Sequence, residues 1–229
     1  DDALIKVAQK AFYNGSLNPR AWRRQALSYD DIANSMMVSH PLRKYQFCSP
    51  AEGGAAIILC NSNLAKRFTS KLVYLKAAVV RTRVYGSFEV YSPCQAKEQG
   101  NAPSVKASQD AFELAGVGPK DFDVLQLQDT ESGAEVMHMA ENGFCEHGEQ
   151  EHLIQSGATA INGSMPVNTD GGCLANGEPV GASGLRQVFE VCLQLRGQAG
   201  DRQVQNNPKL GYTHVYGAPG LSGVTVLAV

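Results

Sequence analysis

The sequence predicts an α/β fold in which helices flank a layered sheet. Runs rich in apolar and β-branched residues, such as 71–85 and 222–229, have the composition of strands. Segments with helical periodicity, such as 183–197, lie between such runs along the chain. Strands that alternate with helices are typical of an α/β layered sheet.

The first hundred residues predict helices, strands and a loop. Residues 3–13 follow a helical period, and Ser28 is placed to cap a short second helix with an acidic first turn. The continuous apolar run at the end of 49–60 predicts a buried strand, and 71–85 predicts another strand or a pair of strands. The Gly, Ser, Pro and Asn residues of 86–103 indicate a long surface loop.

The second half of the chain alternates more regularly. Residues 102–129 predict a helix, a turn and a strand that ends at Asp129. Helical spacing over 132–144 stops at an Asn-Gly pair, which is a natural cap for the carboxyl end of a helix. The remaining pattern predicts one amphipathic helix and two strands around a glycine turn: 183–197, 212–220 and 222–229.

Composition excludes several classes of protein. The net charge of −2 gives no reason to expect binding to nucleic acid or to an acidic membrane surface. No apolar run approaches the roughly 20 residues of a membrane span, and the acidic, amphipathic start of the chain does not resemble a secretory signal. The cysteines form no CxxC pair, so we expect buried thiols in a cytoplasmic protein and no metal site. They are Cys48, Cys60, Cys94, Cys145, Cys173 and Cys192.

Three junctions between predicted strands and helices carry side chains suited to acid–base chemistry. Ligands of α/β proteins gather where strand ends meet helix starts. Taken singly, a carboxylate before a helix is commonly an N-cap and a strand tyrosine is commonly core packing. Taken together, these groups suit proton transfer and stabilisation of an enolate. The junctions hold Asp129 and Glu131; Asn168, Asp170 and Glu178; and Tyr212, His214 and Tyr216.

Several stretches of the chain resemble thiolases. The stretch NTDGGCLANGEPVGASGLRQ, residues 168–187, resembles the Asn-x-x-Gly-Gly … Gly-His-Pro-x-Gly-x-(Ser/Thr)-Gly motif of the thiolase superfamily. Residues 127–157 lie where thiolases of the sterol-carrier type have a His-Asp-Cys-Phe stretch followed by a helix. The segments SLNPRAW and CSPAEGGAAIIL are similar to further thiolase segments. This resemblance implies a thiolase-like layered α-β-α fold with a mixed five-stranded sheet flanked by helices.

A complete thiolase subunit consists of two similar halves, and the resemblance places this chain across both. Residues 1–103 correspond to the remainder of the first half and its accessory loop region. Residues 104–229 correspond to the C-terminal βαβαββ domain. The segment that carries the acylated cysteine of a thiolase is not among these residues.

The chain departs from thiolases at their reactive positions. Glu178 replaces the His of Gly-His-Pro, and Thr130 replaces the Cys of His-Asp-Cys-Phe. Tyr216 lies near the last glycine turn, where many thiolases carry a Cys. Without those groups ordinary Claisen chemistry should fail. The replacements resemble those of thiolase-superfamily aldolases that shorten steroid side chains. The resemblance therefore implies retro-aldol cleavage of a β-hydroxyacyl-CoA into a ketone or aldehyde and a shortened acyl-CoA.

This chemistry assigns roles to the candidate residues. Tyr216 is the first choice for proton transfer at the hydroxyl or at the enolate carbon, assisted by Asp129 and Glu178. Tyr212 and His214 are further catalytic candidates, because residues two apart along a strand share one face with Tyr216. Coenzyme A enters as part of the substrate, and no other cofactor is required. The expected substrate-binding residues are Asn168, Gly181, Ser183 and Gly217.

Two other functions remain open. The first is an atypical 3-ketoacyl-CoA thiolase, which would need free CoA and a reactive cysteine outside these residues. The second is a non-catalytic thiolase-like subunit that binds acyl-CoA. By resemblance, we also expect a homodimer and a small partner protein that combines an OB fold with a zinc ribbon. Any zinc would then belong to that partner.

Overall fold

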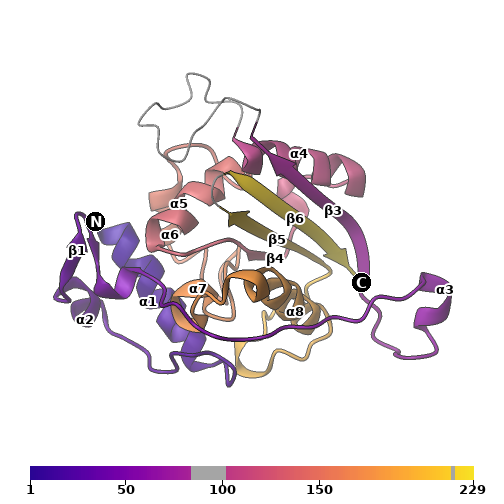
Figure 1. Cartoon of the computed structure of the whole chain (residues 1–229), viewed down its shortest axis with the longest axis horizontal. Helices are drawn as coiled ribbons and strands as arrows, with labels where there is room; N and C mark the ends of the chain where they lie inside the picture. The colour runs from indigo at the N-terminus through magenta and orange to yellow at the C-terminus, as the bar shows by residue number, and fades with distance from the viewer. Residues whose placement is uncertain (84–101, 218–219) are drawn as a thin grey trace.

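The computed structural model describes residues 1–83, 102–217 and 220–229. Their main sheet is mixed and has the strand order β3-β6-β5-β4 (Figure 1). The strands β4 and β5 are parallel, whereas β6 runs antiparallel to both β5 and β3. The prediction of an α/β fold with a mixed sheet flanked by helices is therefore confirmed. The strands are β3 (Tyr74–Thr82), β4 (Val124–Gln126), β5 (Leu210–Gly217) and β6 (Leu221–Ala228).

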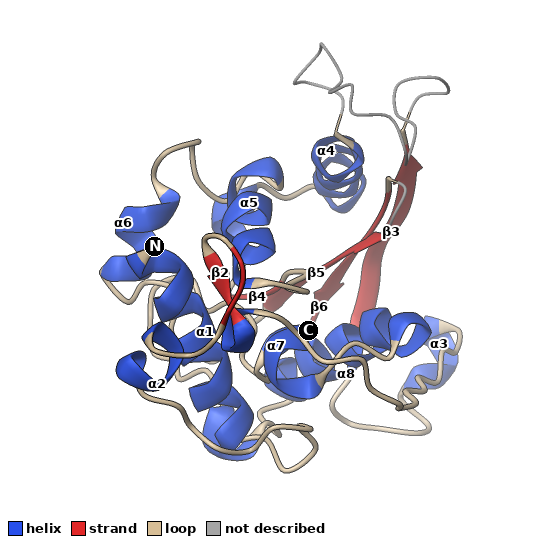
Figure 2. Ribbon diagram, turned by 60° about the vertical axis from the view of Figure 1, so that its left-hand side comes forward, coloured by secondary structure: helices blue, strands red, loops and turns tan. Residues whose placement is uncertain are grey.

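Helices cover both faces of this sheet. Figure 2 shows α4 and α5 on one face and α8 on the other. A separate hairpin of β1 (Met37–Ser39) and β2 (Leu42–Arg43) lies beside α1 and α2. The helices are α1 (Asp2–Ser16), α2 (Tyr29–Ala33), α3 (Ser62–Ala65), α4 (Pro103–Ala115), α5 (Ser132–Glu141), α6 (Gln150–Gln155), α7 (Gly172–Asn176) and α8 (Ser183–Leu195).

Local sequence explains where the predicted helices begin and end. The Ser28 hydroxyl accepts the N–H of Asp31, and the Asp31 carboxylate accepts the N–H of Ser28, so the predicted cap forms a complete capping box. The helix α4 ends at Gly116, whose φ of +69° is the left-handed conformation that glycine adopts most easily. The helices predicted over 3–13 and 183–197 are likewise present. Helices α6 and α7 were not predicted, because each is only one or two turns long.

Alternation along β5 sorts its side chains between the two helical layers. Tyr212 and His214 face α4 and α5, where they contact Ser108 and Ser104. Gly211 faces α8 instead, and a Cβ atom there would lie 2.3 Å from Cγ1 of Val191. Only glycine therefore lets α8 approach this close to the strand.

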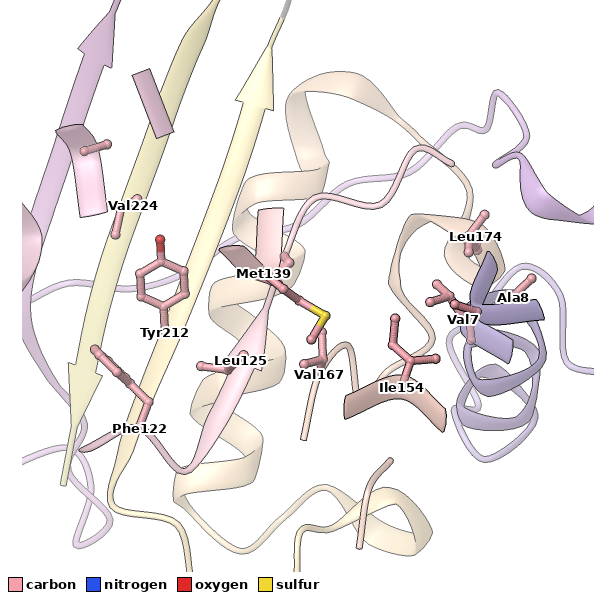
Figure 3. Close-up of a cluster of buried hydrophobic side chains, with 14 of the residues drawn as sticks. Val7, Ala8, Phe122, Leu125, Met139, Ile154, Val167, Leu174, Tyr212 and Val224 are labelled. Carbon is pink, nitrogen blue, oxygen red and sulfur yellow. The ribbon is translucent and has the colours of Figure 1, made fainter. Parts of the chain in front are cut away.

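The main core fills the space between the sheet, α4, α5 and α1. Figure 3 shows it running from Tyr212 and Val224 on the strands, past Met139 and Val167, to Val7 on α1. A smaller cluster under α8 joins the helix to the other face of the sheet; it consists of Val124, Val188, Val191, Leu195, Val204 and Leu227. These two clusters hold the strand ends, and hence the candidate site, in a fixed frame.

The predicted fifth strand is reduced to one bridge in the described part of the chain. Val167 pairs with Leu125 of β4 in parallel fashion, and the N–H of Asn168 donates to the Leu125 carbonyl. Strand β3 extends the sheet at its other edge, although it precedes the predicted domain boundary between residues 103 and 104. The boundary itself stays a prediction. Most of the predicted loop over 86–103 lies outside the described residues.

The prediction of a buried strand over 49–60 is wrong. Residues 51–61 have no regular structure and run across α7 and α8 to α3, as Figures 1 and 2 show. Ile58 is 97% exposed, and the one strand-like contact is a bridge between Pro50 and Glu178. An apolar run forms a buried strand only beside another strand, and no described strand lies alongside this one.

Tyr212 lies inside the main core. Its ring is fully buried among Phe112, Phe122 and Phe144, and its hydroxyl lies 2.7 Å from the Ser108 hydroxyl. Burial raises the pKa of this phenol far above its usual range. Tyr212 is therefore a packing residue, and the structure argues against the catalytic role predicted for it.

Replacing Tyr212 by Phe tests this assignment. We expect Tyr212→Phe to lower the free energy of unfolding by about 1 kcal/mol, because the ring stays and one buried hydrogen bond is lost. Urea unfolding would measure the loss. The control is Tyr13→Phe on the exposed side of α1, which should change stability by less than about 0.5 kcal/mol. Equal effects of the two substitutions would contradict the buried hydrogen bond.

Candidate functional site

Two of the predicted acid–base residues follow neighbouring parallel strands by the same distance. The register pairs Gln126 of β4 with Thr213 of β5. Asp129 comes three residues after Gln126 (129 − 126), and Tyr216 comes three residues after Thr213 (216 − 213). Since the carboxyl ends of parallel strands meet at one edge of a sheet, both residues arise at the same edge.

Asp129 sits on the first turn of α7. Its carboxylate accepts the N–H of Cys173 at 2.6 Å and that of Leu174 at 3.5 Å. The fit depends on Gly172, because a Cβ atom there would lie 1.9 Å from Oδ2 of Asp129. Complete burial, and then the charge of Glu135, raise the pKa of Asp129 well above its usual range. Asp129 therefore holds α7 in place and does not itself reach solvent.

Glu178 is the carboxylate that remains partly accessible. It follows α7 directly and is half-buried. Its carboxylate accepts hydrogen bonds from Nε2 of Gln128 at 2.9 Å, from Sγ of Cys173 at 3.0 Å and from Oγ of Ser183 at 2.5 Å. These donors come from the end of β4, from α7 and from the start of α8. The Glu-Pro loop thus presents one oriented carboxylate where three elements converge.

Two thiols lie in the same region. Cys173 is buried and hydrogen-bonded to Glu178, and its backbone N–H is bound to Asp129. Burial, followed by the charges of Asp129 and Glu178, raises the pKa of Cys48 to about 11. Burial raises the pKa of Cys173 well above its usual range as well. At neutral pH both sulfurs are therefore thiols and poor nucleophiles.

The prediction that the cysteines are buried holds for only one of those described. Cys173 is buried, Cys60 is exposed, and Cys48, Cys145 and Cys192 lie between these extremes. Cys60 is exposed because it lies in the irregular segment 51–61. Cys94 lies outside the described residues.

The predicted substrate-binding residues fall into different environments. Ser183 is buried and its hydroxyl is used by Glu178, whereas Gly181 is exposed in the turn before α8. The N–H of Ala182 in that turn donates to the Pro179 carbonyl. Gly217 ends β5, and a Cβ atom there would meet nothing within 4 Å. Gly181 and Gly217 therefore stay available as backbone contacts for a ligand.

Asn168 belongs to the framework and does not face a ligand. It is fully buried with φ of +54°, a conformation that asparagine tolerates better than most residues. Its side chain donates to Glu135 at 2.8 Å and accepts the N–H of Leu127 at 2.9 Å, while its carbonyl accepts from Asn14. With these groups satisfied, the structure argues against the predicted contact between Asn168 and substrate.

Tyr216 lies in a cluster of rings at the outer end of β5. It is half-buried, and its hydroxyl accepts from Nη2 of Arg83 at 3.3 Å. The ring of His138 on α5 lies 5.5 Å from the Tyr216 ring and 4.5 Å from the His214 ring, measured between centroids. His214 is fully buried, and its Nε2 lies 3.1 Å from Oγ of Ser104. Burial, and then the charge of His138, lower the pKa of His214 well below its usual range.

The predicted residues thus form two groups at one edge of the sheet. Asp129, Glu178 and Ser183 are joined through α7, and His214 and Tyr216 are joined through His138. Sequence reasoning missed Gln128, Arg83 and His138. Gln128 adjoins Asp129 and occupies the position of the His of His-Asp-Cys-Phe, which could have identified it. Nothing in the helical pattern around His138 marks it.

Residues of the Glu-Pro loop also line a pocket. Pro179, Ala182 and Arg186 form one wall, and residues 52–56 form another. Within the described residues no group of three His, Cys, Asp or Glu side chains is arranged to hold a metal ion. No helix in the same residues is both long and apolar enough to cross a bilayer.

Comparison with known proteins gives one family. Residues 91–228 match the family model described as thiolase C-terminal domain-like. The acetyl-CoA acetyltransferase of Methanothermobacter thermautotrophicus is 36% identical over 96% of this chain and 56% of its own length. Sterol carrier protein 2 of Oryctolagus cuniculus is 32% identical over 97% of this chain and 41% of its own length.

A solved structure shares the fold. The Ltp2-ChsH2(DUF35) aldolase superposes with a TM-score of 0.82 and 19% sequence identity, over 99% of this chain and 58% of that one. This similarity shows the fold alone, because the sequence identity is low. The chain spans about half the length of the curated relatives it matches.

The neutral, buried His214 predicts a loss of stability in acid. The unfolded chain takes up a proton at this residue near pH 6.5, whereas the folded protein, with its depressed pKa, does not. Stability should therefore fall as the pH drops below about 6.5, by up to about 1.4 kcal/mol per pH unit from this group.

Denaturant unfolding between pH 7 and pH 5 measures this slope. His214→Gln should flatten it, and the exposed His147→Gln should leave it unchanged. Asp129, whose pKa is raised, contributes with the opposite sign, but it is common to all three proteins and cancels in the comparison. An unchanged slope in His214→Gln would mean that this histidine is not buried in its neutral form.

The raised thiol pKa values predict the order of alkylation. At pH 7, iodoacetamide should modify the exposed Cys60 readily, Cys48 slowly, and Cys173 only after unfolding. Peptide mapping by mass spectrometry would give each rate, with the urea-unfolded protein as the control. Alkylation of Cys48 or Cys173 as fast as that of Cys60 would reveal an activated sulfur and favour a thiolase mechanism.

Proposed function

Because this chain belongs to the thiolase superfamily, with relatives of the sterol-carrier type, we propose that it performs retro-aldol cleavage of a β-hydroxyacyl-CoA. The substrate would carry a steroid-type side chain. The products would be a ketone or aldehyde and an acyl-CoA shortened by the departing fragment. The shared fold of the solved aldolase is consistent with this proposal.

The position of Tyr216 is the observation that supports the proposed retro-aldol cleavage most. This phenol stands at the same sheet edge as Asp129, three residues beyond the paired parts of β4 and β5. A partly accessible carboxylate, Glu178, occupies the position of the His of Gly-His-Pro and is oriented by three donors. A substrate that reaches both Tyr216 and Glu178 would have a phenol and a carboxylate beside its reacting atoms.

The proposed reaction needs no electron sink beyond the thioester. The hydroxyl of the substrate loses its proton, the bond between the α and β carbons breaks, and its electron pair moves onto the thioester oxygen. The resulting enolate then takes up a proton at its α carbon. We assign the proton transfer to Tyr216, whose oxygen faces the Arg83 guanidinium. Negative charge that develops on that oxygen would be stabilised by this cation.

The remaining residues have supporting roles in this proposal. Glu178 would hold the substrate hydroxyl or a water molecule, and Asp129 would keep α7 and Glu178 in position. Gly217 and the turn at Gly181 would bring backbone N–H groups to the thioester oxygen.

A thiolase with altered acid and base groups is the second candidate, and the curated relatives favour it. Against it stand two replacements: Glu178 takes the place of the His of Gly-His-Pro, and Thr130 takes the place of the Cys of His-Asp-Cys-Phe. A subunit without catalysis is the third candidate. It would not explain why a carboxylate with three oriented donors replaces the thiolase-motif His.

We also propose that the protein acts in a heteromeric complex. The description of the solved aldolase names two components, Ltp2 and ChsH2(DUF35). A small partner with an OB fold and a zinc ribbon would help to bind the acyl-CoA here as well. A homodimer and a cytoplasmic location stay predictions from the sequence.

A cleavage assay tests the function. The full-length protein, with its partner, should split β-hydroxyacyl-CoAs in the absence of free CoA. Tyr216→Phe should slow this reaction by about 100-fold or more, because it removes the proton-transfer group. The exposed Tyr13→Phe serves as the matched control and should retain full activity.

Each other outcome identifies an alternative. Cleavage of 3-ketoacyl-CoAs alone, and only with added CoA, would mean that the protein is a thiolase. Acyl-CoA binding without turnover of either substrate class would mean a non-catalytic subunit.

A further inference from the structure

His138 contacts the candidate catalytic tyrosine but belongs to none of the motifs in the sequence. It lies on α5 and is 1% exposed. Its ring contacts the rings of Tyr216 and His214, and its Nδ1 lies 2.9 Å from Oε2 of Glu141, one turn further along the helix. A buried imidazole with a carboxylate on one side and a phenol on the other is more specific than packing requires.

We propose that His138, oriented by Glu141, is a positioning residue that holds the ring of Tyr216 in its reactive orientation. The proposal rests on the function proposed above, in which Tyr216 exchanges a proton with the substrate.

Among the described residues, the neighbours of Tyr216 on the strands are small. It is the second-last residue of β5, and the last is Gly217, which has no side chain. The residue paired with it on β6 is Ser222, a small side chain on the same face. In the described part of the chain, His138 is the one aromatic residue in contact with the Tyr216 ring. Nη2 of Arg83 donates to the Tyr216 hydroxyl at 3.3 Å.

Glu141 gives the imidazole a fixed direction. The carboxylate can only accept a hydrogen bond at Nδ1, so it keeps a proton on that nitrogen and restrains rotation of the ring. An apolar side chain of the same size at position 138 would fill the space but could turn freely. The angle of 41° between the His138 and Tyr216 rings is therefore fixed from the Glu141 side.

The other groups that face His138 do not compete for this role. His214 from β5 lies 4.5 Å away and is neutral, because burial lowers its pKa well below the usual range. Ser104 on α4 satisfies Nε2 of His214. Among the described residues, the charged partners of the two rings are thus Glu141 on α5, which binds His138, and Arg83 after β3, which binds Tyr216.

Substitutions of His138 distinguish two roles: filling the space beside the Tyr216 ring, and holding that ring in one orientation. His138→Leu fills the space but loses the bond to Glu141, whereas His138→Asn keeps an N–H donor in the position of Nδ1. We expect His138→Leu to lower kcat by between about 10-fold and about 100-fold with little change in KM, because a bound substrate then meets a misplaced phenol. His138→Asn should recover part of the loss, and Met137→Ala, an exposed neighbour on α5, should have no effect.

A second readout does not depend on turnover. In the full-length protein labelled with ¹³C in its tyrosine rings, the Tyr216 signal can be assigned with Tyr216→Phe. Its chemical shift should change in His138→Leu and in Glu141→Gln, and return toward wild type in His138→Asn. A merely structural role would lower the melting temperature without moving this signal.

The two readouts distinguish two failures. A wild-type protein without lyase activity would overturn the proposed function, and the Tyr216 signal would still show whether His138 positions the ring. Wild-type rates and an unmoved Tyr216 signal in folded His138→Leu would overturn the positioning role. Equal losses in the Leu and Asn variants would also overturn it, because orientation by Glu141 would then be irrelevant.

Discussion

The contact between the buried Asp129 carboxyl and the backbone of α7 is the constraint on which the candidate site depends. Asp129 follows β4, and α7 opens the glycine-rich stretch that leads to Glu178, so this contact joins the sheet to the loop. It leaves no space for a side chain at position 172. Because the carboxyl is shut off from water, it depends on these N–H groups of α7 for its hydrogen bonds. The position of Glu178 therefore depends on the hydrogen bonds between Asp129 and α7.

Paired charges beneath the loop reinforce this arrangement. Glu135 binds both Lys10 and Asn168, Asp170 binds Arg186, and Glu190 forms a two-pronged contact with Arg202. Buried ion pairs of this kind add little net stability compared with apolar packing, but losing one partner is costly. Their effect here is specificity. Asp170 ties the loop to Arg186 on α8, while Glu135 and Glu190 hold the loop residues Asn168 and Thr169 by hydrogen bonds. Few alternative loop conformations would satisfy every one of these buried groups.

The sequence predicted the elements whose signals are local. Helical spacing, a capping serine and glycines at helix ends placed α1, α2, α4, α5 and α8, and apolar runs placed β3, β5 and β6. The strand ends were also recognisable as carriers of acid–base groups. The run 51–61 was misjudged because apolar composition says nothing about whether a partner strand lies alongside. Tyr212 was made a further catalytic candidate beside Tyr216 because a period of two assigns the face of a strand and not the depth. His138 escaped notice since its neighbours in space come from another element.

The surroundings of the polar side chains on β5 change sharply along the strand, from fully buried to half-buried. Tyr212 stands in an aromatic core, His214 among buried hydroxyls, and Tyr216 at a half-open edge beside a guanidinium. This change takes four residues, roughly 13 Å of strand. The inner phenol cannot give up its proton at any physiological pH, and its task is to stiffen the frame. The position of a residue along β5 therefore decides whether its side chain is accessible enough for proton transfer. A single substitution at the outer end of β5 could therefore add or remove a proton-transfer group during evolution. The fold would tolerate this substitution because the residues at the inner end of the strand form the core.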